Sequence, residues 1–155
     1  MLLALQKMFP NPMNFQLKFT SASGTSASTF DSNMKSVGSF LIVIKATTGY
    51  VFGAYVKDSL SSGSGWSRGS LETFLFTFGT GNSPVKLLHN GSGNGIHLGS
   101  CGLHLGSDLV AFCSHTCQPS VYTQVAPGYS ATVNSSLLAG TTSYSPSLME
   151  VFAQC

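Results

Sequence analysis

Five cysteine and histidine residues gather in the second half of the chain: Cys101, His104, Cys113, His115 and Cys117. Thiolate sulfur and imidazole nitrogen are ligands that Zn²⁺ prefers, and an exposed thiol of lowered pKa supports redox chemistry. The spacing of the last two cysteines, with three residues between them, differs from the closer pairs of a zinc knuckle. We expect buried or unreactive thiols, with no bound metal and no cofactor. The alternative is a Cys/His metal-binding or thiol redox protein, which stoichiometric zinc in elemental analysis would support.

Carboxylates are scarce, because the chain has only five acidic residues. Glu72 follows a stretch that contains the single Trp66 and precedes a Phe-rich run. Its carboxylate can accept N–H groups of its own loop or pair with a lysine or arginine of a partner. Asp108 and Glu150 flank expected strands, and acid–base chemistry would require them to be neighbours in space. Strand-end hydrogen bonding is the simpler interpretation of both, and Trp66 either folds onto the core or stacks on a ligand.

Other catalytic arrangements lack their sequence context. A Ser-His-Asp set can be drawn from His104, Asp108 and one of many serines, but no G-x-S-x-G strand–turn–helix motif accompanies it. The glycine-rich run at 90–99 is not followed by Lys-Ser or Lys-Thr, so it is not a phosphate-binding loop. We therefore expect no catalytic residues and no enzymatic activity.

The composition indicates a single domain over residues 1–155 with an unusually uncharged surface. Charged residues make up 8 % of the chain, against about 25 % in ordinary soluble domains. The net charge of +2 and the scattered lysines exclude an electrostatic footprint for nucleic acid. No apolar run reaches the roughly 18 to 20 residues of a membrane span. A surface so poor in charge leaves the oligomeric state open.

Residues 1–12 are expected to form a helical or extended lead-in that packs on the domain. The apolar stretch at the start is interrupted by Gln6 and Lys7 and has no basic region before it, unlike a signal peptide. We therefore expect a cytoplasmic protein with reduced thiols. A secreted carbohydrate-binding β-sandwich is a further alternative. It predicts disulfides and glycans at Asn90 and Asn134, which an intact mass under non-reducing conditions would reveal.

Strand patterns dominate the chain. Residues 15–19 alternate apolar and polar side chains, as in a half-buried strand, whereas 40–44 are continuously apolar, as in a strand buried on both faces. A tight turn at 47–49 predicts a hairpin to a strand at 50–56. Further strands are expected at 73–78, 86–89, 95–98, 108–113 and 148–153. Ala27, Phe30 and Met34 have helical spacing, and 118–145 reads as long surface loops. The fold class expected is mainly β (α+β), a two-sheet antiparallel β-sandwich with one or two short helices.

Five segments occur in a specific order: FQLKF at 15–19, TTGYVFGAY at 47–55, GWSRGSLETFLF at 65–76, GLHLGSDLVAF at 102–112 and MEVFAQ at 149–154. As an ordered set they resemble the TLDc domain, the module of oxidation-resistance proteins, in a short stand-alone form. The residues that match the family motifs are Gly49, Gly53, Trp66, Glu72, Gly106, Asp108 and Glu150.

The resemblance implies a β-sandwich that acts through protein interaction. It implies a role in protection against oxidative stress and in binding and regulating the vacuolar-type proton ATPase. It carries no catalytic residues and no cofactor with it. By the same resemblance Gly49 makes a turn and Gly53 lets neighbouring backbones approach each other.

Overall fold

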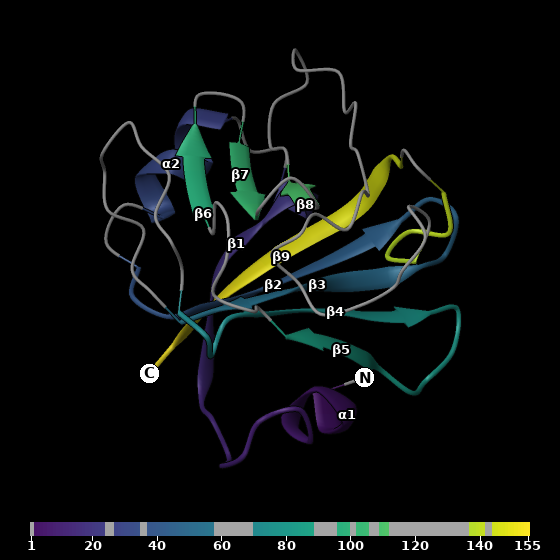
Figure 1. The fold of residues 1–155 in the computed structure, drawn as a ribbon. Helices are drawn as coiled ribbons and strands as arrows, with labels where there is room; N and C mark the ends of the chain where they lie inside the picture. Colours follow the sequence, from purple (N-terminus) through teal and green to yellow (C-terminus); the bar gives the residue numbers. More distant parts are fainter. Residues whose placement is uncertain are drawn as a thin grey trace.

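The computed structural model describes residues 2–23, 27–34, 37–57, 70–88, 96–99, 102–105, 109–111, 137–141 and 144–155. In these ranges the helical elements are α1 (Leu2–Gln6), the 3₁₀ turn Ser21–Ser23 and α2 (Ala27–Met34). The strands are β1 (Phe15–Thr20), β2 (Phe40–Ala46), β3 (Val51–Val56), β4 (Phe74–Gly79), β5 (Val85–Leu88), β6 (Ile96–Gly99), β7 (Gly102–Leu105), β8 (Leu109–Ala111) and β9 (Pro146–Gln154) (Figure 1). No helix in this described part is both long enough and apolar enough to cross a membrane.

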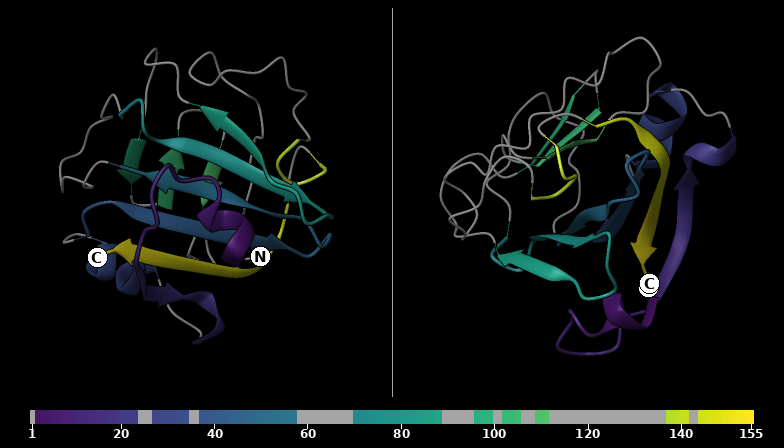
Figure 2. Two further views of the ribbon diagram at one scale, coloured as in Figure 1. Left: turned by 90° about the horizontal axis from the view of Figure 1, so that it is seen from below. Right: turned by 90° about the vertical axis from the view of Figure 1, so that its right-hand side faces the viewer.

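The strands form a large sheet in the order β1-β9-β2-β3-β4-β5 and a small one in the order β6-β7-β8. Each pair of neighbouring strands among these nine is antiparallel. The prediction of a mainly antiparallel β fold with few short helices is therefore confirmed. The small sheet and α2 lie on one side of the large sheet and α1 on the other (Figure 1), and Figure 2 shows α1 in front of the large sheet when the molecule is seen from below. The packing of the two sheets as a sandwich stays a prediction.

The hairpin of β2 and β3 has the predicted position and a defined turn. The Gly49 N–H donates to the Ala46 carbonyl (3.0 Å), and the Ala46 N–H donates to the Tyr50 carbonyl (2.9 Å). Gly49 has φ 90°, a left-handed value that glycine adopts without a Cβ penalty. A three-residue loop that closes on a left-handed residue matches the right-handed twist of the two strands.

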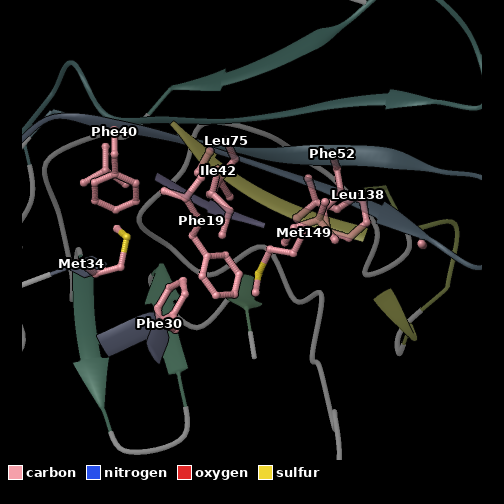
Figure 3. Packing of buried hydrophobic residues seen from close by; sticks show 14 of the residues in the cluster. Phe19, Phe30, Met34, Phe40, Ile42, Phe52, Leu75, Leu138 and Met149 are labelled. Carbon is pink, nitrogen blue, oxygen red and sulfur yellow. The ribbon is translucent and has the colours of Figure 1, made fainter. Parts of the chain in front are cut away.

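The continuously apolar strand β2 is buried on both faces, as predicted. Phe40, Ile42 and Ile44 belong to the same buried cluster as Phe30 and Met34 of α2. The rings of Phe19 and Phe30 meet edge to face, with centroids 5.1 Å apart. Figure 3 shows these side chains converging beneath the sheet, together with Phe52, Leu75, Leu138 and Met149.

The opposite face of the large sheet is covered by the lead-in. Leu5, Met8 and Phe9 are buried against Tyr55, Phe74, Phe76 and Phe78, of which the last three are the Phe-rich face expected for this strand. Gln6, which interrupts the apolar start of the sequence, has a structural task. Its amide Nε2 donates to the Met13 carbonyl (2.9 Å) and its Oε1 accepts the Met13 N–H (3.3 Å). The side chain thus replaces a peptide group and closes the loop that follows α1.

Two details differ from the sequence patterns. Leu17 was expected on the buried face of the first strand, but it is 48 % exposed. The register of β1 against β9 shifts between Leu17 and Phe19, which breaks the simple alternation. Strand β7 was not predicted, because its four residues lie inside a glycine-rich stretch. The predicted loops at 118–145 fall mostly outside the described residues.

Residues 137–141 are hydrogen-bonded to β4 and to the β2–β3 turn of the large sheet. Thr77, which is buried, donates from Oγ1 to the Leu138 carbonyl (3.0 Å), and Thr48 donates to the Ala139 carbonyl (3.3 Å). Tyr144 is buried beside this segment with its ring edge to face against Phe52, at a centroid distance of 4.8 Å. Burial raises the pKa of the Tyr144 hydroxyl well above its usual value of 10.0.

We predict that Tyr144 destabilises the fold at alkaline pH. The unfolded chain ionises this hydroxyl above pH 10 whereas the folded chain retains the proton, so the free energy of unfolding falls as pH rises. One such group accounts for a loss on the order of 1 kcal/mol at pH 11. Urea titrations at pH 8 and pH 11 should show a smaller loss for Tyr144→Phe than for the wild type. Equal losses in both proteins would contradict this assignment.

Candidate functional site

The turn before β4 presents the acidic residue that the sequence singled out. The Thr73 N–H donates to the Ser70 carbonyl (3.0 Å), which closes a four-residue turn over Ser70, Leu71, Glu72 and Thr73. The Ser70 hydroxyl accepts the Glu72 N–H (3.1 Å). A serine at the first position of such a turn satisfies a backbone donor that would otherwise face solvent. The Glu72 N–H is thus bonded by the Ser70 hydroxyl, and the Glu72 carboxylate is available for contacts outside the turn.

The turn is anchored to the end of β3. The side chain of Thr73 is 1 % exposed, and its hydroxyl accepts the Lys57 N–H (3.2 Å). The carbonyl of Lys57 accepts the hydroxyl of Ser39 (2.6 Å), which precedes β2. These bonds tie the turn to the start of β2 and the end of β3. The turn is therefore held in place by buried and half-buried groups.

The Glu72 carboxylate forms a surface ion pair. Its Oε2 lies 3.4 Å from Nζ of Lys57, and the two side chains are 66 % and 38 % exposed. A pair this exposed contributes about 0–1 kcal/mol, because water screens it. Leu71, beside it, is also 66 % exposed. The turn therefore presents an apolar and an acidic side chain together on the surface. Little free energy is lost if Glu72 exchanges Lys57 for another cation.

The other matched residues are distributed over the fold. Gly49 lies in the β2–β3 turn, and Gly53 lies in β3 opposite Val43 and Phe76. Glu150 is half-buried in β9, opposite Thr20 and Val43. Trp66, Gly106 and Asp108 lie outside the described residues.

One member of the cysteine–histidine set falls on a described strand. His104 lies in β7, directly opposite His97 of β6 and Val110 of β8. Cys101, Cys113, His115 and Cys117 lie outside the described residues, so the set as a whole is not placed. Among the residues that the structure describes, no three potential ligands gather around a point. That His97 and His104 lie opposite each other was not predicted from the sequence. The alternation of Leu103, His104 and Leu105 is the sequence signal that could have indicated β7.

Two comparisons with known proteins bear on identity. The family model described as the TLDc domain matches residues 2–154, which is all but the first and last residue. A search of curated proteins found no match.

Proposed function

Because this chain belongs to the TLDc domain family, we propose that it is a non-catalytic, cytoplasmic interaction domain that binds subunits of the vacuolar-type proton ATPase. Through this binding it regulates the pump and supports tolerance of oxidative stress. The match of the family model over residues 2–154 is the observation that carries the proposal. The family resemblance supplies the partner.

We propose that the two sheets pack face to face as a β-sandwich. The face of the large sheet that carries Ile44 and Phe52 is buried, and β6–β8 lie on that side of it (Figure 1). A buried sheet face requires a covering layer. The sandwich would leave the ends of the strands, including the turn at Ser70–Thr73, at its rim.

We place the contact with the partner at that turn. Glu72 and Leu71 are each 66 % exposed, and the backbone beneath them is hydrogen-bonded to β3. A fixed backbone lowers the entropy lost on binding, and an exposed carboxylate steers a basic partner surface. Lys57 holds Glu72 loosely, so an arginine or lysine of the partner can replace it.

The test is an affinity pull-down from native membrane and cytosolic extracts, with bound proteins identified by mass spectrometry. The wild-type chain is expected to enrich proton-ATPase subunits, and Glu72→Lys is expected to lose them because it places a second cation beside Lys57. Lys18→Glu, a charge change of equal size and opposite sign at an exposed position of β1, is the control for a change of surface charge elsewhere and should retain binding. Failure of the wild type to enrich these subunits would overturn the proposed partner, and unchanged binding by Glu72→Lys would remove the turn from the interface.

We predict that Glu72→Gln leaves the fold intact. The ion pair to Lys57 is exposed, and in the described residues the Glu72 carboxylate forms no second ion pair. The free energy of unfolding should therefore change by less than about 0.5 kcal/mol. Urea unfolding followed by circular dichroism measures it, and a loss above about 1.5 kcal/mol would show that the carboxylate has a structural role instead.

A further inference from the structure

A pocket lies on the α1 side of the large sheet, away from β6–β8 (Figure 1), between the lead-in and the β4–β5 turn. It has a volume of about 370 Å³ and is lined by Ala4, Lys7, Met8, Asn82, Ser83, Pro84 and Lys86. Its size is at the lower end of the range of small-molecule sites. Among the described residues, the lining contains two lysines, an amide and a hydroxyl and no acidic residue.

The ammonium group of Lys86 is held in place rather than free in solvent. Its Nζ donates to the Met8 carbonyl (2.8 Å) and lies 4.0 Å from the centroid of the Phe74 ring. Desolvation lowers the pKa of Lys86 from its ordinary value of 10.5. A carbonyl and an aromatic ring stabilise a cation only partly, and an ammonium has three donors. Lys86 therefore keeps donor capacity toward the pocket.

The positive charge of the pocket is not neutralised by the described part of the protein. Among the described residues, the ion pair joins Lys57 and Glu72, which do not line this pocket. Neither Lys7 nor Lys86 forms an ion pair with a described carboxylate. Lys7 and Lys86 both line this hollow, and an anion bound in it would be attracted by both positive charges. Lysine binds oxyanions as a point charge, and amide and hydroxyl groups supply further hydrogen bonds.

We propose that this pocket binds an oxyanion, a phosphate or carboxylate group held by Lys7 and Lys86 with Asn82 and Ser83 at its rim. The group is carried either by a small molecule or by an acidic side chain of a polypeptide, since both present the same oxygens. The site is separate from the turn at Glu72 and does not depend on the function proposed above.

The experiment is a titration of the ¹⁵N-labelled chain, monitored through backbone amides and lysine ammonium signals at constant ionic strength. Inorganic phosphate is expected to shift the signals of Asn82, Ser83 and Lys86 and to saturate, whereas chloride should not. A short Asp-rich peptide forms the second arm. Saturation by phosphate alone assigns a small anion, and tighter binding of the peptide than of phosphate assigns an acidic side chain.

The variants separate the site from general charge. Lys7→Gln is expected to weaken phosphate binding about fivefold, and Lys86→Gln by at least as much. Lys45→Gln, which removes an exposed lysine of β2 that does not line the pocket, should leave the affinity unchanged. Because Lys86 also holds Met8, Lys7→Gln serves as the decisive variant if Lys86→Gln unfolds. The proposal is overturned if phosphate gives no saturating shift, if chloride gives the same shift, or if Lys45→Gln weakens binding as much as Lys7→Gln.

Discussion

Replacing Gly53 with alanine is expected to lower the free energy of unfolding by about 3–5 kcal/mol, a large part of the total for a domain of this size. A Cβ at this position would overlap the carbonyl oxygen of Ile42 and lie 2.9 Å from both the carbonyl carbon of Ile42 and Cζ of Phe76. The carbonyl cannot move aside, because it belongs to β2, which is hydrogen-bonded on both sides. The phenyl ring of Phe76 is itself fully buried.

Gly38→Ala is the matched control for this substitution. A Cβ there meets no atom within 4 Å, and Gly38 does not have a positive φ. The control should therefore change stability by less than about 0.5 kcal/mol, or raise it slightly by restricting the unfolded chain. Urea unfolding of the two variants beside the wild type measures both effects. Coincident transitions for the two variants would show that β2 and β3 tolerate a side chain at Gly53.

Phe30→Ala is expected to cost about 3–5 kcal/mol, since it removes a fully buried ring and leaves a cavity. Phe30 is 0 % exposed, and its ring meets Phe19 of β1 edge to face. Helix α2 has only eight residues, too few to be stable alone, so its position depends on Phe30 and Met34. Thermal and urea unfolding should show the loss, with the helical signal reduced most.

Leu17→Ala provides the comparison for Phe30→Ala. Leu17 lies in the same strand as Phe19 but is 48 % exposed, so its truncation should cost less than about 1 kcal/mol. A Phe30→Ala protein as stable as Leu17→Ala would mean that α2 is held by other contacts. An intermediate loss for Phe30→Leu would support the dependence on buried volume.

The elements that could be predicted from the sequence are those in which apolar residues recur at the spacing of one face, or of both faces, of a strand or helix. The apolar run at 40–44 and the alternating phenylalanines at 74, 76 and 78 gave their strands correctly, as did the helical spacing of Phe30 and Met34. The exposure of Leu17 could not be predicted, because it follows from a register shift between two strands far apart in sequence. The same holds for Gln6, whose amide is used by Met13 only after the loop closes.

The candidate site shows the same division. Glu72 stood out because acidic residues are few, but Lys57 lies fifteen positions earlier in the sequence. The antiparallel pairing of β3 with β4 brings the end of one strand beside the start of the other, and so brings these two residues together. Lys86 and Lys7 are brought to one pocket by the lead-in folding under β4 and β5. Isolated lysines in a chain of low charge carry no pattern that predicts such a meeting. Local sequence therefore predicts the elements, whereas the groups that face one another depend on the order of strands in the sheet.

That order has a consequence for how the protein is made. Strand β9, residues 146–154, lies between β1 and β2, so one of the inner strands of the large sheet is synthesised after all the others. While the ribosome still holds residues beyond 145, β1 has no neighbour in the sheet and the inner edge of β2 is open. Pairings across such sequence distances form slowly, and exposed strand edges favour aggregation. A nascent chain that lacks β9 therefore exposes strand edges that favour aggregation, and a premature stop before residue 146 removes the strand that joins β1 to the rest of the sheet.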